Sequence, residues 1–323
     1  MGDQAILVLT HSDDPELGML SDVPAGFRPV VGTKASQFSN ELSTATIILH
    51  WSGSRALLRE VFLDCPNLKW VHSRSAGLDT VLFPELVESP AVLTNGTGVF
   101  SASLGEFAVA AILYFAKDFR RMIRNQVAGI WEPFDVEPIA GKTLGIVGYG
   151  DIGRAVAVRA HTLGMRVVAL RRQAHSRSDD QGIVSEIFTT DQLKAMLSAC
   201  DYVVVSAPLT DATRGMIAEG EFSAMKNSAV LINVGRGPVI DEGALIRALQ
   251  AEQIRGAALD VFDEEPLPPG HPFYGLENVL LSPHCADHLP DWKESAMQFF
   301  LEQLERFRKG EALKNIVEKH RGY

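Results

Sequence analysis

Cysteine is scarce in this sequence. The 323 residues include only Cys65, Cys200 and Cys285, which are odd in number, far apart, and form no Cys-x-x-Cys pair. This pattern excludes a disulfide framework and indicates neither a zinc site nor a thiol redox site. We therefore expect no bound metal and a protein that works in a reducing compartment, the cytoplasm.

No long hydrophobic run is present either. The most apolar stretch, from Phe107 to Ala116, is about half as long as the roughly 20 residues that a bilayer-spanning helix requires. The first residues, Met1 to Ile6, have neither the basic region and apolar core of a secretory signal nor the Ser or Thr of a myristoylation signal. These absences favour a cytoplasmic protein without a membrane partner.

Basic residues are outnumbered by acidic ones. With 30 Lys and Arg against 40 Asp and Glu, the formal net charge is -10, which repels a phosphate backbone and argues against a nucleic-acid partner. Hydrophobic residues make up 46% and charged residues 22% of the chain, as in ordinary folded proteins. At about 150 residues per domain, the length predicts two domains.

Short runs rich in Val, Ile and Leu alternate with helical patterns, which predicts parallel strands joined by crossover helices. The first series of such runs covers residues 5–9, 46–50 and 69–72. The second series covers residues 144–147, 167–170, 202–205, 230–233, 257–260 and 279–281. Six strands in one block are enough for a complete doubly wound sheet.

Two further segments read as helices. The stretch from Ser101 to Arg124 is apolar on most sides and ends in arginines, so we expect one buried helix running between domains or subunits. Residues 292–308 predict an amphipathic helix that folds back onto the first domain. The expected fold is α/β, with a doubly wound Rossmann sheet over 101–286 and a smaller α/β unit formed from both termini (1–100 and 287–323).

A glycine-rich motif follows the first strand of the second series. Gly148-Tyr149-Gly150-Asp151-Ile152-Gly153 lies between that strand and a helical stretch, which is the setting of a dinucleotide-binding turn. Its glycines allow a tight turn and a close approach to a pyrophosphate, which then lies at a helix N-terminus with free N–H donors. The motif predicts a nicotinamide dinucleotide cofactor.

The end of the next strand indicates which dinucleotide is preferred. An NAD site usually has a carboxylate there, about 20 residues after the glycines, whereas this chain has Arg171 and Arg172. Two guanidinium groups can pair with a 2′-phosphate through charge-assisted bonds. We therefore predict that NADP(H) is preferred, with NAD(H) as the alternative if both arginines are only solvated loop residues.

Three later strands end in ionisable side chains, within Asn233 to Gly237, Asp260 to Pro266, and Ser282 to His284. With these segments the sequence resembles the D-isomer-specific 2-hydroxyacid dehydrogenases, the group of glyoxylate and hydroxypyruvate reductases. The resemblance covers essentially the whole chain, from the Ser75 to Asp79 turn through the glycine motif to the Gly235 to Asp241 stretch and His284. It implies hydride transfer from NADPH or NADH to a small 2-keto acid such as glyoxylate or hydroxypyruvate, giving the D-2-hydroxy acid. It also implies that the Rossmann unit (101–286) is the nucleotide-binding domain. The smaller unit (1–100 and 287–323) is then a flavodoxin-like α/β substrate domain, with a cleft between the two.

The resemblance assigns catalytic roles to Arg236, Glu265 and His284. Reduction of a ketone needs a proton on the oxygen, and His holds a proton near neutral pH. A carboxylate such as Glu265 favours the protonated imidazole and orients the ring. Arg236 can bind the substrate carboxylate and polarise the ketone. The neighbouring Asp263 and Glu264 are competitors for the carboxylate role, but the position before Pro266 matches the family pattern and selects Glu265.

Further site residues rest on the resemblance alone. It implies that backbone amides of Ala76 and Gly77 hold the substrate carboxylate. The residues implied to bind the cofactor outside the glycine motif are Asp260, Val234, Gly235 and Ala286 near the nicotinamide, and Pro208 and Thr213 near the adenosine. Trp51 is either a wall of the substrate pocket or plain core.

The chain departs from the family after His284, where Cys285 to Trp292 replace a small pair of residues. Asp287 and His288 either lie at the rim of the pocket or cap the helix that Trp292 begins. Glu265 argues against a formate dehydrogenase, which has Gln at this position. The alternatives are a phosphoglycerate dehydrogenase-like enzyme and a dinucleotide-sensing corepressor, and the resemblance suggests a homodimer.

Overall fold

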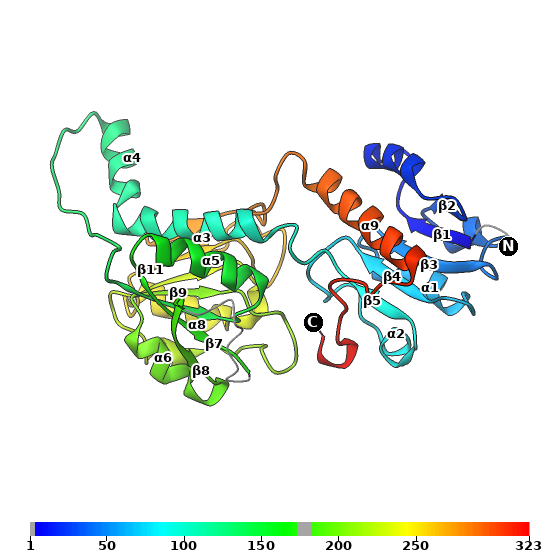
Figure 1. The fold of residues 1–323 in the computed structure, drawn as a ribbon. Helices are drawn as coiled ribbons and strands as arrows, with labels where there is room; N and C mark the ends of the chain where they lie inside the picture. Colours follow the sequence, from blue (N-terminus) through cyan, green and yellow to red (C-terminus); the bar gives the residue numbers. More distant parts are fainter. Residues whose placement is uncertain (1–3, 173–181, 323) are drawn as a thin grey trace. The chain divides into compact units, whose positions relative to one another are not determined.

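The computed structural model describes residues 4–172 and 182–322 (Figure 1). Met1 to Asp3 lie outside the described residues, so the structure says nothing of this part of the N-terminal segment that lacks a targeting signal in sequence. Contacts within the chain define two compact units, one formed by Met1–Phe100 with Leu289–Tyr323 and the other by Ser101–His288. The second division falls two residues later than the sequence suggests. In the described part of the chain, no helix is long and apolar enough to cross a membrane.

The first unit contains a parallel sheet of five strands in the order β2-β1-β3-β4-β5. The strands are β1 (Gln4–Leu9), β2 (Phe27–Gly32), β3 (Ala45–His50), β4 (Trp70–Ser73) and β5 (Val92–Thr94). The two edge strands, β2 and β5, were not predicted from the sequence. Strand β2 is only half-buried and contains a proline, and β5 has three residues, so neither shows the apolar run of a central strand.

Helices cover both faces of this sheet. On one face, α9 (Trp292–Lys309) buries Met297, Phe300 and Leu304 against the strand residues Ile6 and Leu49. The opposite face is covered by α1 (Arg55–Leu63), and α2 (Pro84–Glu88) packs in the same core cluster. The predicted helix over 292–308 and its return to the N-terminal part of the chain are therefore both observed.

The second unit contains a parallel sheet of seven strands in the order β12-β11-β10-β9-β6-β7-β8. The strands are β6 (Thr143–Val147), β7 (Arg166–Leu170), β8 (Val184–Phe188), β9 (Tyr202–Val205), β10 (Val230–Asn233), β11 (Gly256–Leu259) and β12 (Val279–Leu281). Six of them were predicted, and the seventh, β8, is a half-exposed edge strand. The predicted pair of α/β sheets, one Rossmann-like and one smaller, is confirmed.

The prediction of a single helix from Ser101 to Arg124 is wrong. The chain instead forms α3 (Ser101–Ala116) and α4 (Phe119–Ala128), which separate at Asp118. Asp118 adopts a left-handed conformation (φ 50°), and its carboxylate accepts the Arg121 N–H at 3.2 Å, which caps α4. Only α3, packed against α5 (Asp151–Thr162), is buried as expected.

Parallel strands bring their carboxyl ends to one edge of the sheet, so the turns after β6, β7, β9, β10, β11 and β12 lie along a common edge. The strand order reverses at β6, with β7 on one side and β9 on the other. Ligands of open α/β sheets bind outside such a switch point. This edge carries every site residue that the sequence predicts for the second unit.

Candidate active site

The glycine turn between β6 and α5 has room for a pyrophosphate. Gly148 has φ 92°, and an ideal Cβ there would lie 2.5 Å from Ala207 Cα; a Cβ on Gly153 would lie 2.6 Å from the Gly148 oxygen. These two glycines are required by close packing of the chain itself. At Gly150, in contrast, a Cβ would meet no heavy atom within 4 Å. Gly150 therefore borders open space at the start of α5, and the turn fits a dinucleotide.

The other side chains of the motif face the protein. The Tyr149 ring is buried, and the Asp151 carboxylate accepts a hydrogen bond from the Ser101 hydroxyl at the start of α3. Gly150, which precedes α5, provides no side-chain cap for the helix. The backbone N–H groups of the first turn of α5 are therefore the donors that this motif can offer to a phosphate.

Two arginines end β7. The Arg171 N–H donates to the Phe188 oxygen at 2.9 Å, and its guanidinium lies 5.4 Å from the centroid of the Tyr149 ring. Positive charge thus lies beside the glycine turn, where an NAD site would place a carboxylate. Arg172 follows as an exposed residue.

The segment after β9 is held by its own threonine. The Thr213 hydroxyl donates to the Pro208 oxygen at 2.6 Å and accepts the Thr210 N–H at 2.8 Å. These bonds fix the loop that contains both residues predicted to flank the adenosine. In the neighbouring turn, Val234 is buried, and a Cβ on Gly235 would lie 2.9 Å from the Ala207 oxygen.

The turn that carries Arg236 is held by a buried amide. Asn233 Oδ1 accepts the Gly235 N–H at 3.1 Å, and Asn233 Nδ2 donates to the Arg236 oxygen at 3.1 Å. Gly237 approaches the β11 turn so closely that a Cβ would lie 2.0 Å from the Phe262 carbonyl carbon. Arg236 is therefore presented from a backbone that is fixed on both sides.

His284 and Glu265 form a hydrogen-bonded pair. His284 Nδ1 lies 2.6 Å from Glu265 Oε2, and Glu265 Oε1 accepts the Phe262 N–H at 2.9 Å. Among the described residues, neither competing carboxylate forms a hydrogen bond or ion pair with the imidazole, and burial, with the nearby charges of Glu242 and Asp241, raises the pKa of the Asp263 carboxyl. Of the three adjacent acidic residues, the structure brings Glu265 to the imidazole.

The imidazole of His284 has one nitrogen left for a ligand. With Nδ1–H directed at the Glu265 carboxylate, Nε2 has no hydrogen-bond partner among the described residues. The residue itself has φ 50°, a left-handed conformation that costs a side-chain-bearing residue about 1 kcal/mol or more. Such strain persists only where the surroundings enforce it.

Asp260 enforces that geometry. Its carboxylate is almost fully buried, and one oxygen, Oδ1, accepts the Ser282 hydroxyl at 2.5 Å, the Cys285 N–H at 3.0 Å and the Ala286 N–H at 3.1 Å. These three bonds bracket His284. The other oxygen, Oδ2, has no partner within the described chain. Asp260 thus both positions the histidine and retains an acceptor for a ligand.

Asp287 and His288 do not cap α9. The residue at the N-cap of α9 is Asp291, whereas Asp287 Oδ1 lies 3.8 Å from His288 Nε2. Burial raises the pKa of the Asp287 carboxyl. Of the two alternatives that the sequence left open, helix capping is therefore wrong.

In the first unit, the loop from Arg74 to Asp79 follows β4 at the carboxyl edge. Asn95 Nδ2 donates to the Ala76 oxygen at 2.7 Å, and the Gly96 N–H donates to the Ser75 oxygen at 3.2 Å. The N–H groups of Ala76 and Gly77 donate to no described residue. Two unpaired, partly buried backbone donors in sequence are suited to bind a carboxylate.

Trp51 lies in the core beneath this edge. It is fully buried against the α9 face of the sheet, and its Nε1–H donates to Asp14 Oδ2 at 2.9 Å.

Comparison with known proteins identifies the family. A family model described as the NAD binding domain of D-isomer specific 2-hydroxyacid dehydrogenases matches residues 109–286. A glyoxylate reductase of Korarchaeum cryptofilum is 35% identical over 269 residues, covering 80% of this chain and 78% of that protein. The chain belongs to the D-isomer-specific 2-hydroxyacid dehydrogenase family. It is an oxidoreductase that interconverts small 2-keto and 2-hydroxy acids with a nicotinamide dinucleotide.

Other members of the dehydrogenase family agree over nearly the same extent. A glyoxylate/hydroxypyruvate reductase B of Enterobacter sp. is 34% identical over 262 residues, covering 79% of each chain. The crystal structure of a family member from Xanthobacter autotrophicus, in complex with NADPH and MES, is 28% identical, has a TM-score of 0.85 and covers 100% of both chains.

Three residues that position the site of this dehydrogenase were not predicted from the sequence. Asn233 holds the Arg236 turn, Ser282 donates to Asp260, and Ser103 donates to the Ala286 oxygen at 2.6 Å. Asn233 and Ser282 were visible as polar residues at strand ends, which is a usable signal. Ser103 lies on a helix far away in sequence, and nothing local indicates its contact. Among the described residues, no group of three His, Cys, Asp or Glu is arranged to hold a metal ion.

Proposed function

We propose that this dehydrogenase reduces glyoxylate or hydroxypyruvate to the corresponding D-2-hydroxy acid, with NADPH as the preferred reductant. The hydrogen-bonded pair of Glu265 and His284, with Nε2 unpaired at the carboxyl edge, carries the proposal. The substrate range is supported by the names of two relatives, a glyoxylate reductase that is 35% identical to this chain and a glyoxylate/hydroxypyruvate reductase B that is 34% identical.

In the proposed mechanism, His284 donates a proton from Nε2 to the ketone oxygen. Glu265 accepts the Nδ1–H, which orients the ring. Arg236 binds the substrate and stabilises negative charge that develops on the oxygen. The dinucleotide supplies the hydride. In the reverse direction His284 accepts the proton, so the same residues serve oxidation.

The remaining contacts are proposed from the geometry of each segment. The Ala76 and Gly77 amides bind the substrate carboxylate, because their N–H groups have no acceptor within the described chain. Asp260 Oδ2 would accept a hydrogen bond from the carboxamide N–H of a bound nicotinamide, beside Val234, Gly235 and Ala286. The turn from Gly148 to Gly153 would hold the pyrophosphate, and the loop from Pro208 to Thr213 would flank the adenosine.

The preference for NADPH is proposed to reside in the arginines after β7. Replacing both Arg171 and Arg172 by Ala removes the partners of the 2′-phosphate, and each charge-assisted bond is worth about tenfold or more in affinity. The ratio of kcat/KM with NADPH to that with NADH is expected to fall at least tenfold, chiefly through a higher KM for NADPH. An unchanged ratio, or a wild-type preference for NADH, contradicts the assignment.

The double variant needs a matched control. Arg166, at the start of β7, pairs with Glu186 at 3.1 Å and is exposed at the opposite end of the strand. Arg166→Ala removes a positive charge from the same strand without touching the glycine turn. The cofactor ratio of this variant is expected to equal that of the wild type.

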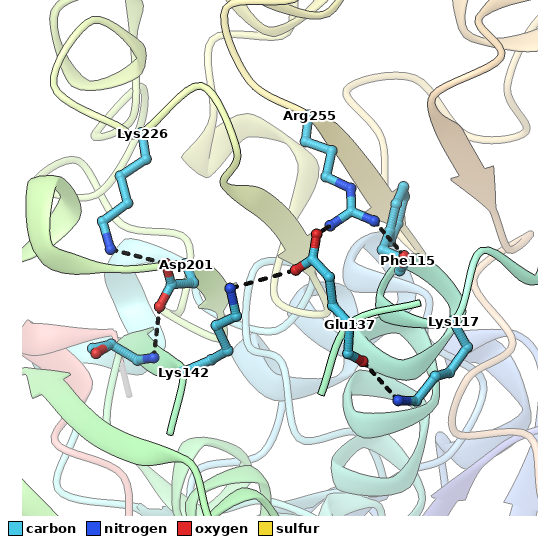
Figure 2. A network of polar contacts seen from close by, with 8 residues as sticks. Phe115, Lys117, Glu137, Lys142, Asp201, Lys226 and Arg255 are labelled. Atoms are coloured by element: carbon cyan, nitrogen blue, oxygen red, sulfur yellow. Dashed lines mark hydrogen bonds and ion pairs between the residues drawn. The ribbon is translucent and has the colours of Figure 1, made fainter. Parts of the chain in front are cut away.

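A homodimer is proposed from an apolar surface on α4 and the segment after it. This surface comprises Ile123, Val127, Ile130 and Trp131, of which Val127 is 85% and Trp131 98% exposed. An apolar side chain of that size is rarely left fully in water unless a partner covers it. Glu137, beyond this surface, is fixed by Lys117, Lys142 and Arg255, so the segment is anchored at its base (Figure 2).

Charge on this surface is expected to break the dimer. For the wild type, light scattering is expected to give twice the 35.2 kDa of one chain. The double variant Val127→Glu/Trp131→Glu is expected to give the monomer mass, because a carboxylate in an apolar interface is desolvated without a partner. A wild-type mass near that of one chain overturns the proposal, as does a variant that stays dimeric. Val158→Glu, on the partly exposed face of α5, serves as the control.

The reaction is tested by following NADPH oxidation with glyoxylate, hydroxypyruvate, pyruvate and a branched 2-keto acid. Turnover of glyoxylate or hydroxypyruvate above the other two supports the proposed substrates. Tight NADPH binding without turnover of any of the four compounds contradicts the proposed reaction and is the result that a dinucleotide-sensing protein predicts. A cytoplasmic location remains a prediction from the composition.

A further inference from the structure

A second cationic group lies at the carboxyl edge of the first unit, outside the residues assigned so far. Arg74 directly follows β4, and its guanidinium carbon lies 5.3 Å from the ring centroid of Trp51 and 5.3 Å from that of Trp292. Trp51 follows β3, and Trp292 begins α9. Both tryptophans thus hold the guanidinium through cation–π contacts, which fix its orientation.

No described residue accepts a hydrogen bond from the N–H groups of this guanidinium. An arginine has five donors in a planar fork, yet Arg74 forms no side-chain hydrogen bond or ion pair with any described residue. The residue is half-buried, and burial lowers the pKa of its guanidinium. A partly desolvated cation without an acceptor gains more from an incoming anion than a solvated surface arginine does.

The two nearest carboxylates act on the Arg74 guanidinium only over a distance, because neither forms a hydrogen bond or ion pair with it. Asp14 accepts the Trp51 Nε1–H at 2.9 Å and the Thr10 hydroxyl at 3.3 Å, and Glu16 lies 3.9 Å from Lys293 Nζ. Their charges act on Arg74 over a longer distance, which offsets part of the cost of burying it. Neither carboxylate accepts a hydrogen bond from the Arg74 guanidinium.

Arg74 also belongs to the segment that bears the proposed substrate-binding amides. Gly77 is three residues further on, so the two Cα atoms are at most about 11 Å apart. The segment is held against β5: a Cβ on Gly96 would lie 2.2 Å from the Arg74 oxygen. One short, fixed stretch of backbone therefore offers two separate groups that bind carboxylates.

We propose that Arg74 is a substrate-specificity residue that binds a second carboxylate at the far end of the 2-keto acid. Among its substrates the enzyme then favours four- and five-carbon 2-keto dicarboxylic acids over uncharged analogues of the same length. The proposal rests on the proposed function, because it takes the Ala76 and Gly77 amides as the site of the first carboxylate. The Arg74 guanidinium is planar and lies against two indole rings. A carboxylate that approaches in the plane of the guanidinium can therefore form two parallel hydrogen bonds with it.

The test compares substrates of matched length that differ in the terminal group. We would measure kcat/KM for 2-oxoglutarate against 2-oxopentanoate, and for oxaloacetate against 2-oxobutanoate. In the wild type, each dicarboxylate is expected to exceed its partner by about tenfold to 100-fold, the range of a charge-assisted pair. In Arg74→Met, whose side chain can still fill the space between the indoles, the ratio is expected to approach one.

Two further variants make the comparison specific. Arg74→Lys keeps the charge but loses the planar fork and is expected to give an intermediate ratio. Arg59→Met, on α1, removes an arginine of the same unit that pairs with Glu85 on the protein surface, and its ratio is expected to match that of the wild type.

The outcomes separate this proposal from the proposed function. Turnover of 2-keto acids with no preference for dicarboxylates, or with a preference that survives in Arg74→Met, overturns the role of Arg74 and leaves the reductase activity standing. Absence of turnover with all 2-keto acids overturns the proposed function itself. If Arg74→Met fails to fold, as judged by its melting temperature, the substrate ratios of the wild type and of Arg74→Lys still test the role of Arg74. A wild-type ratio near one, or an unchanged ratio in Arg74→Lys, overturns it.

Discussion

Replacing His284 by Ala is expected to lower kcat by at least about 100-fold, because positioned proton transfer typically contributes 10²- to 10⁴-fold. No other described group is paired with Glu265 in this way, so no neighbouring side chain replaces the lost donor. The dissociation constant for NADPH, measured by fluorescence titration, should change little, since the variant keeps the glycine turn. Steady-state kinetics with glyoxylate provide the measurement.

Two further variants serve as controls for the loss of kcat in His284→Ala. His161→Ala removes an exposed histidine near the end of α5 and should retain wild-type kcat. Glu265→Gln keeps a hydrogen-bond acceptor for Nδ1–H but removes the charge, so its kcat should lie between those of the wild type and His284→Ala. If His284→Ala retains more than a tenth of wild-type kcat, the proton-donor role is wrong.

Replacing Arg236 by Met is expected to lower kcat/KM for the 2-keto acid by about 10²- to 10³-fold, the usual cost of removing one donor to a developing oxyanion. The substitution removes the 2.8 Å bond from the Arg236 guanidinium to the Gly235 oxygen, but the turn should remain in place because Asn233 still bonds to the Arg236 and Gly235 main-chain groups. Stopped-flow or steady-state measurement of kcat and KM, with NADPH affinity as the second readout, tests this expectation.

The comparison for Arg236 is a surface arginine of the same unit. Arg247 on α8 (Glu242–Gln250) pairs with Glu219 at 3.2 Å, and Arg247→Met should leave both kinetic parameters within about twofold of the wild type. If kcat/KM falls by less than tenfold in Arg236→Met, the guanidinium is not needed in the transition state. A parallel loss of NADPH affinity would instead indicate that the turn has moved.

The sequence predicted those parts of the fold and site whose pattern lies within one continuous segment of the chain. The buried strands appear as apolar runs, and the glycine turn is readable because strand, glycines and helix are contiguous. The edge strands β2, β5 and β8 were missed, because a half-exposed or three-residue strand lacks a continuous apolar run. The break at Asp118 was missed because a left-handed residue inside an apolar segment leaves no periodic signal.

Contacts between distant segments were the main limit for the site. Family resemblance linked Glu265 to His284, and the structure shows the 2.6 Å bond between them. It did not indicate that Trp292, at the start of α9, lies over Arg74, or that Ser103 on α3 bonds to the Ala286 oxygen. Such pairs depend on how separate strands and helices pack, which no local window of sequence contains.

The attachment of the His284 loop to Asp260 has a consequence for how this enzyme can diverge. Two of the three bonds to Asp260 Oδ1 come from the main chain of Cys285 and Ala286, so they do not depend on which side chains those positions carry. Substitutions at 285 can therefore change the surroundings of the histidine without removing the main-chain bond that holds the loop. Position 286 keeps its bond in the same way, but its side chain is limited by the nicotinamide that is proposed to lie beside it. A substitution of Asp260 removes all three bonds at once. The loop can therefore change in composition during evolution, while the His284 imidazole stays beside Glu265, only as long as Asp260 is kept.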